Sequence, residues 1–140
     1  MSSTKIETGT YAHLHISRVP NSRRSRDKKL RKEFIRYVHR LYRGCEQWVP
    51  WFDAEMIRLI DKTHPYFDHS DADFFVARNG SDTVGRIAVL YNTLYNEKHN
   101  EDAAHFYFFD CGNHSQIARA LIQRATDWAK KRGCKKLIGP

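Results

Sequence analysis

The chain has 140 residues and a net charge of +8, with 41% hydrophobic and 13% aromatic residues. This length is enough for one domain with its own core, and the apolar content excludes a disordered chain. The sequence has no apolar run long enough to span a bilayer and no apolar signal-peptide core near its start, so we expect a soluble, cytoplasmic protein. Cys45, Cys111 and Cys134 are widely spaced, which predicts reduced thiols and no disulfide or zinc framework.

The positive charge is concentrated in one segment. Residues 18–43 contain eleven Lys and Arg against two acidic residues, a local balance of +9, and the rest of the chain has a balance of −1. Any interaction with a polyanion is therefore expected in this segment.

The first half of the chain predicts a strand and two helices. Alternating apolar residues from Ala12 to Ile16 indicate a half-buried strand. A helix is expected from Ser25 to Tyr42, with one apolar face and one face rich in Arg and Lys. The aromatic loop Trp48–Phe52 is expected to fold back onto the core, and Asp53 is expected to cap a short second helix.

The second half begins with the clearest hairpin pattern. Two β-rich runs, 74–78 and 84–90, flank Asn79-Gly80, a pair that favours a tight turn. A polar connection follows, and then the aromatic strand His105–Asp110, a break at 111–115, an amphipathic helix from Gln116 to Arg132 and a last strand at 136–140. Gly133 stands where a helix C-cap glycine is expected.

The strand–loop–helix unit at 105–132 predicts an anion site. A short loop between a strand and a helix brings free backbone N–H groups and the positive end of the helix dipole to one point. Phosphate is the commonest ligand of such a point, but the unit is also compatible with packing alone.

The order of the elements, with the hairpin just before this unit, resembles the GNAT (N-acetyltransferase) superfamily. The individual motifs resemble a bacterial GNAT-like branch and extend over nearly the whole chain. They are Trp48-Val-Pro50, His64-Pro-Tyr-Phe67, Val84-Gly-Arg-Ile87, the aromatic strand Phe106–Asp110 and Ile138-Gly-Pro140. The resemblance implies an α/β fold with a mixed, mostly antiparallel sheet flanked by helices. It also implies that residues 1–140 are the N-terminal portion of a GNAT-like domain whose last helix and two strands would follow Pro140.

The resemblance implies an acyl-CoA-dependent N-acyltransferase with acetyl-CoA as co-substrate and a small-molecule or peptide amine as acceptor. The family loop (Gln/Arg)-x-x-Gly-x-(Gly/Ala) aligns with residues 113–118, where Asn113 replaces Gln/Arg and Gln116 replaces the first glycine. Only Ala118 fits, which predicts a weakened site and weak or absent activity. The residues predicted to bind the cofactor are Tyr107, Phe108, Phe109, Gly112, Asn113, His114, Ser115, Gln116, Ile117 and Ala118.

Asp110 is the candidate catalytic residue, because a carboxylate at the end of this strand can act through water as a base. The alternative, which the residue pattern favours, is a cap or a turn-stabilising side chain before Gly112. Arg86 is expected to form a structural ion pair. The histidines, including His64 and His69 near two aspartates, match no zinc spacing, so no metal is predicted.

The rival hypothesis is a catalytically silent GNAT-like module that binds nucleic acid through the basic segment 18–43. The apolar residues of the expected helix argue for a solvated basic face instead, and recognition of an acidic acceptor is a third reading. We further expect no membrane partner, and self-association through an exposed edge of the last strand.

Overall fold

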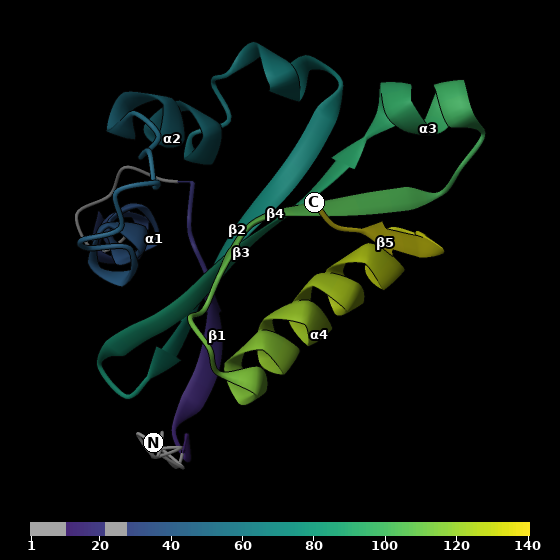
Figure 1. The fold of residues 1–140 in the computed structure, drawn as a ribbon. Coiled ribbons are helices and arrows are strands. Elements are labelled where there is room, and N and C mark those ends of the chain that lie inside the picture. Colours follow the sequence, from purple (N-terminus) through teal and green to yellow (C-terminus); the bar gives the residue numbers. More distant parts are fainter. Residues whose placement is uncertain (1–10, 22–27) are drawn as a thin grey trace.

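Five strands form one sheet in the order of the sequence (Figure 1). The structure is a computed structural model and describes residues 11–21 and 28–140. Neighbouring strands are antiparallel from the first to the fourth, and the fourth and fifth are parallel, as the sequence predicts. The strands are β1 (Leu14–Arg18), β2 (Ser70–Asn79), β3 (Asp82–Asn92), β4 (Ala103–Asp110) and β5 (Lys136–Ile138).

Helices cover both faces of the sheet. Helices α1 (Lys28–Leu41) and α2 (Asp53–Ile60) lie on one face, and α4 (Ser115–Lys131) lies on the other (Figure 1). Strand β2 shows how two cores arise, because Phe74 and Val76 pack toward α1 and α2 while Phe75 and Ala77 pack toward α4. The α/β class and the mixed sheet predicted from the sequence are confirmed.

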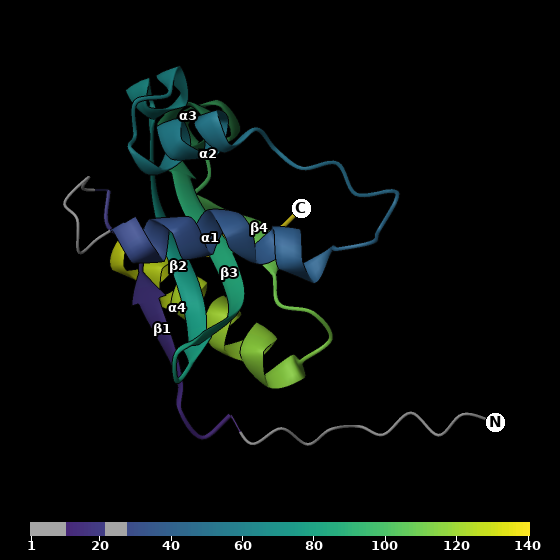
Figure 2. The same cartoon turned by 90° about the vertical axis from the view of Figure 1, so that its left-hand side faces the viewer.

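Helix α4 begins and ends within one residue of its predicted limits. Its apolar stripe is buried against the sheet, and Gly133, at φ 74°, follows its last turn as a C-cap glycine. Helix α1 lies across β2 and β3 (Figure 2). Residues 12 and 13 of the predicted first strand are not part of β1. Residues 25–27 of the predicted first helix lie outside the described residues.

Two local expectations are wrong. The hairpin turns at Gly80-Ser81, since Asn79 still pairs with Asp82, and only Gly80 has a positive φ. The polar connection contains helix α3 (Thr93–His99), which Asn92 caps by accepting a hydrogen bond from the Tyr95 N–H. A helix this short has too few turns to show periodicity in the sequence.

The aromatic loop also departs from expectation. Trp48 stacks on Tyr42, but Val49 and Phe52 are 80% and 81% exposed, and Trp51 is 61% exposed. The connection swings out beyond the end of α1 before it enters α2 (Figure 2). Asp53 does not cap α2, because the N-cap residue is Phe52 and no side chain bonds the cap.

Candidate active site

A β-bulge interrupts β4 shortly before α4 begins. The register of β3 and β4 shifts between Arg86 and Ala88, so Phe108 and Phe109 together face Ile87. Phe108 has φ 51°, a left-handed conformation that costs a residue with a side chain ~1–3 kcal/mol. A bulge bends a strand and takes backbone groups out of the hydrogen-bond ladder. The sheet is therefore locally open at Phe108.

The side chain of Phe108 is held on the face of the sheet that α1 and α2 cover. Its ring centroid lies 6.4 Å from that of Phe34 and 5.6 Å from that of Trp51, both edge-to-face. The Arg86 guanidinium carbon lies 5.4 Å from the same ring. These contacts stabilise the ring in place and oppose the backbone strain at the bulge.

The edge of β4 that faces β5 is paired only in its first half. Strand β5 pairs with Ala103, Ala104 and His105, and within the described residues no strand pairs with that edge beyond them. Gly139, just after β5, lies against the Phe106 ring, where an added Cβ would come within 2.3 Å of a ring carbon. The edge from Phe106 to Asp110 thus has backbone groups that an extended ligand can reach.

The loop after β4 leads to an uncapped helix N-terminus. His114 is the N-cap residue of α4, and no side chain hydrogen-bonds the cap. The residues from Gly112 to Gln116 are exposed, and Gly112 takes φ 60°. The first N–H groups of α4 are therefore available to a ligand, at the positive end of the helix dipole. The arrangement suits a phosphate or another anion.

Gly85 on β3 allows α4 to lie close to the sheet. A Cβ added at Gly85 would come 2.9 Å from Leu121 Cδ1, 3.0 Å from Ile117 Cγ2 and 3.2 Å from Cys111 Cβ. Only a residue without a side chain fits under this part of the helix. Gly85 thereby sets where the N-terminal half of α4 sits relative to the bulge.

Arg86, the next residue, organises the opposite face. Its Nε donates a hydrogen bond to Asp110 Oδ2 at 3.0 Å, and its Nη1 donates to the Phe34 carbonyl oxygen at 2.9 Å. The Tyr42 hydroxyl donates to Asp110 Oδ1 at 2.6 Å. Burial lowers the pKa of Arg86, and the hydrogen bond to Asp110, together with burial, raises the pKa of Tyr42 to about 12. The structural ion pair predicted for Arg86 is confirmed.

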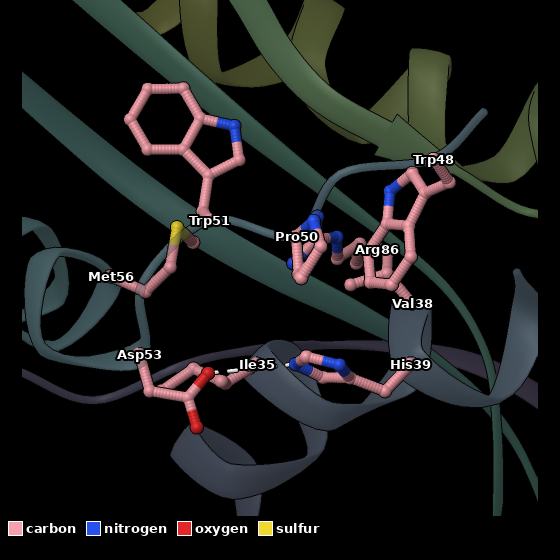
Figure 3. A pocket seen from close by; sticks show the side chains of 9 residues that line it. All are labelled: Ile35, Val38, His39, Trp48, Pro50, Trp51, Asp53, Met56 and Arg86. Atoms are coloured by element: carbon pink, nitrogen blue, oxygen red, sulfur yellow. Dashed lines mark ion pairs between the residues drawn. The ribbon is translucent and has the colours of Figure 1, made fainter. Parts of the chain in front are cut away.

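A small pocket lies between α1, the aromatic loop and α2 (Figure 3). Its volume is about 20 Å³, enough for about one water molecule. His39 Nε2 on α1 lies 3.5 Å from Asp53 Oδ1 at the start of α2, so this pair joins the two ends of the loop (Figure 3). Arg86 closes the pocket from the side of the sheet.

A larger groove of about 250 Å³ lies further along the same face, beside β4. His105 and Tyr107 line it from β4, three residues and one residue before Phe108. Burial lowers the pKa of His105, so its imidazole is neutral at neutral pH. Its Nδ1 is buried and has no hydrogen-bond partner among the described residues. The groove is completed by Tyr66, Leu90, Asn92 and Tyr95.

The structure brings the predicted site residues into one continuous stretch along the end of β4 and the start of α4. Two of them are limited by their surroundings. Ile117 is fully buried, so only its backbone can meet a ligand, and both carboxylate oxygens of Asp110 already accept hydrogen bonds. The catalytic role of Asp110 stays a prediction. Sequence reasoning missed the bulge, His105 and Tyr42, and no local pattern in the sequence indicates the contact between Tyr42 and Asp110.

Other candidate chemistry finds no support in the described part of the chain. No group of three or more His, Cys, Asp or Glu residues there is placed to hold a metal ion. Asp71, one of the aspartates near His69, pairs with Lys62 and Arg132 instead. The three cysteines are free; Cys45 is exposed, and Cys111 and Cys134 are buried, which raises the pKa of both thiols. Across 11–21 and 28–140, no helix is long and apolar enough to span a bilayer.

Solved structures identify the fold. A tandem GNAT protein from the clavulanic acid biosynthesis pathway superposes with a TM-score of 0.70 at 16% identity, over 90% of this chain and 36% of that one. An aminoglycoside acetyltransferase from an uncultured soil metagenomic sample gives 0.62 at 15% identity, over 92% and 78%. Ribosomal-protein-alanine N-acetyltransferase from Brucella melitensis biovar Abortus 2308 gives 0.57 at 18% identity, over 91% and 79%.

The chain is therefore an α/β protein with the GNAT fold, as its sequence motifs suggested. No family model matches it. It is 31% identical over 109 residues to protein YghO of Escherichia coli K12, and the aligned residues make up 78% of this chain and 28% of that protein. It is 30% identical over 111 residues to bacterial ceramide synthase of Caulobacter vibrioides, covering 78% and 29%. The chain spans less than a third of the length of these two curated relatives.

Proposed function

We propose that residues 1–140 form the N-terminal portion of a GNAT-like domain that transfers an acyl group from acyl-CoA to an amine. The observation that carries this proposal is the alignment of three features along one line of backbone. These are the half-paired edge of β4, the bulge at Phe108 and the uncapped N-terminus of α4. An extended thioester with a diphosphate at one end needs a backbone edge, a polarising group and an anion site in this sequence.

In this proposal the backbone from Gly112 to Ala118 holds the diphosphate of acetyl-CoA. The free N–H groups of the first turn of α4 and the φ of 60° at Gly112 support this placement. The backbone of Tyr107, Phe108 and Phe109 holds the pantetheine arm as an added strand would. The side chain of Gln116 replaces a glycine in this loop and weakens the approach of phosphate.

The reaction requires one bond to form and one to break. The amine nitrogen attacks the thioester carbonyl, a C–N bond forms, the C–S bond breaks, and the CoA thiolate leaves with a proton. A backbone N–H freed by the bulge polarises the carbonyl oxygen. Asp110, whose oxygens accept from Arg86 and Tyr42, fixes the end of β4 and is a positioning residue in this scheme.

The acceptor amine enters by the groove beside β4, where neutral His105 accepts its proton. The groove's volume, its three tyrosines and the imidazole of His105 on its wall support this assignment. The names of the relatives support an amine acceptor in general, because they include an aminoglycoside acetyltransferase, a ribosomal-protein-alanine N-acetyltransferase and a bacterial ceramide synthase. The ceramide synthase further supports a long-chain amine as acceptor and a fatty acyl-CoA beside acetyl-CoA as donor. A cytoplasmic location would give the protein access to both thioesters.

Two measurements test the proposal. Calorimetric titration with acetyl-CoA and palmitoyl-CoA should show binding, and release of CoA should depend on an added amine such as sphinganine. His105→Ala should lower turnover by about a hundredfold without changing acetyl-CoA affinity. His99→Ala is the matched control, since His99 also touches the Tyr95 ring but does not line the groove. Absence of binding by either thioester overturns the proposal.

A further inference from the structure

The exposed face of α1 is a continuous row of cations. Apart from the adjacent pair at its start, its residues recur at three- and four-residue steps, so they share one side of the helix and of the turn that follows it. The only acidic residue of α1, Glu33, accepts hydrogen bonds from Thr83 and Arg40. Apart from Arg40, the structure gives these cations no ion pair within the described residues. We call this row the basic stripe: Lys28, Lys29, Lys32, Arg36, Arg40 and Arg43.

The segment that follows α1 carries exposed apolar side chains. Val49 and Phe52 project almost fully into solvent, and Trp51 is more than half exposed. The segment is held in place, because Trp48 packs on His39 of α1 and on Tyr42 just after it. The His39–Asp53 pair also joins α1 to the start of α2 (Figure 3). We call residues 49–52 the apolar tip.

The basic stripe and the apolar tip are neighbours in space as well as in sequence. The connection between α1 and α2 continues past the C-terminal end of α1 (Figure 2). Arg40 is in the last turn of α1, and Arg43 follows the helix and precedes the tip in the sequence. Exposed apolar side chains are unfavourable in water. An anionic lipid interface accommodates these side chains and also attracts the cations beside them. The aromatic side chains suit the headgroup level of a bilayer, and the cations suit anionic headgroups.

We propose that the basic stripe and the apolar tip dock the protein onto an anionic lipid bilayer surface, with the tip inserted between headgroups. Single-stranded nucleic acid would bind the stripe and stack on Trp51 and Phe52. A lipid interface also accommodates Val49 and Pro50, and vesicles and RNA are therefore compared in the test. The proposal does not depend on the acyltransferase assignment. Trp51 touches Phe108, so docking brings the bulge of β4 close to the lipid surface.

Vesicle flotation tests the docking with three double variants. Vesicles of phosphatidylcholine containing about a third phosphatidylglycerol are compared with pure phosphatidylcholine at low and high salt. Lys32→Glu/Arg36→Glu removes charge from the stripe, and Val49→Ser/Phe52→Ser removes the tip. Lys130→Glu/Lys131→Glu makes the same charge change at the exposed C-terminal end of α4 and is the matched control. All substituted side chains are exposed, and thermal melts confirm that each variant is folded.

Wild type and the α4 control should float with the anionic vesicles and not with pure phosphatidylcholine. The stripe variant should bind about tenfold more weakly or worse, and salt should weaken the wild type. The tip variant should lose several-fold in affinity for vesicles and less for a single-stranded RNA. The proposal is overturned if wild type does not float or if the tip variant floats like wild type. It is also overturned if the α4 control loses as much vesicle binding as the stripe variant.

Discussion

Arg86 on β3 and Asp110 at the end of β4 form a buried ion pair, with Nε 3.0 Å from Oδ2, directly across from the bulge. Arg86 and Asp110 are register partners, so the pair holds β3 and β4 together on the carboxyl side of the strained residue Phe108. Replacing Arg86 with Leu should therefore lower the free energy of unfolding by ~3–5 kcal/mol, because Asp110 and the Phe34 carbonyl would lose a buried donor. Urea unfolding measures this loss.

An exposed ion pair serves as the comparison. Arg58 and Glu55 lie 3.3 Å apart on α2, with about half of the arginine side chain exposed. Arg58→Ala should change the free energy of unfolding by less than ~1 kcal/mol. If Arg86→Leu costs no more than this, the buried pair contributes nothing measurable to the stability of the sheet.

Two tyrosines make the fold sensitive to alkali. Burial raises the pKa of Tyr37 to about 12, and the hydrogen bond to Asp110 raises that of Tyr42 to about 12. The unfolded chain loses these protons near pH 10, before the folded protein does, so stability is complete below about pH 10 and is lost between about pH 10 and 12. Denaturant unfolding at several pH values in this window measures the decline. Tyr42→Phe should make the decline shallower, and an equal slope in this variant would exclude Tyr42 as a source.

Gly85→Ala should displace the N-terminal half of α4. The new methyl group would lie within 3.0 Å of Leu121 and Ile117, and the clash should cost ~1–3 kcal/mol. Amide hydrogen exchange in the first turns of α4 should accelerate more than elsewhere in the helix. Gly133→Ala is the control, since it strains a positive φ at the other end of α4 without a clash. Equal exchange rates in the first turns of the two variants would contradict the role given to Gly85.

Gln116→Gly should tighten acetyl-CoA binding several-fold, because it removes a side chain from the path of the diphosphate. Ala118→Glu should abolish binding through charge repulsion with the phosphates. Calorimetric titration compares both with wild type. Gln123→Gly, at an exposed position further along α4, controls for the loss of helix propensity. Identical affinities in Gln116→Gly and Gln123→Gly would place the diphosphate elsewhere.

The patterns were sufficient for α4, whose apolar stripe is buried on one face, and for the hairpin strands, whose apolar runs are buried on both faces of the sheet. The motifs also led to the GNAT fold, and the structure explains two of them: Gly85 lies under α4, and Gly139 lies against Phe106. Both positions need glycine because a neighbouring side chain approaches the backbone closely, and the sequence alone does not show which side chain that is.

The rest of the site depends on contacts that no local pattern encodes. Tyr42 and Asp110 are 68 residues apart, and the bulge arises from the register between β3 and β4. Phe108 carries a ring where a left-handed residue is usually glycine, so its sequence position argued for a regular strand. The aromatic loop was predicted to be buried because its residues are apolar, whereas the structure exposes most of them. Self-association through the edge of β5 stays a prediction.

The unequal exposure of the three thiols gives the protein a built-in attachment point. Cys45 is exposed, while the other two are buried with raised pKa values, so a maleimide reagent should react at one position. That position lies between Arg43 and the apolar tip. A spin label or fluorophore there can report the arrival of a lipid surface without removal of any other cysteine. The same thiol adds a fixed background to any colorimetric measurement of released CoA, and Cys45→Ser removes it.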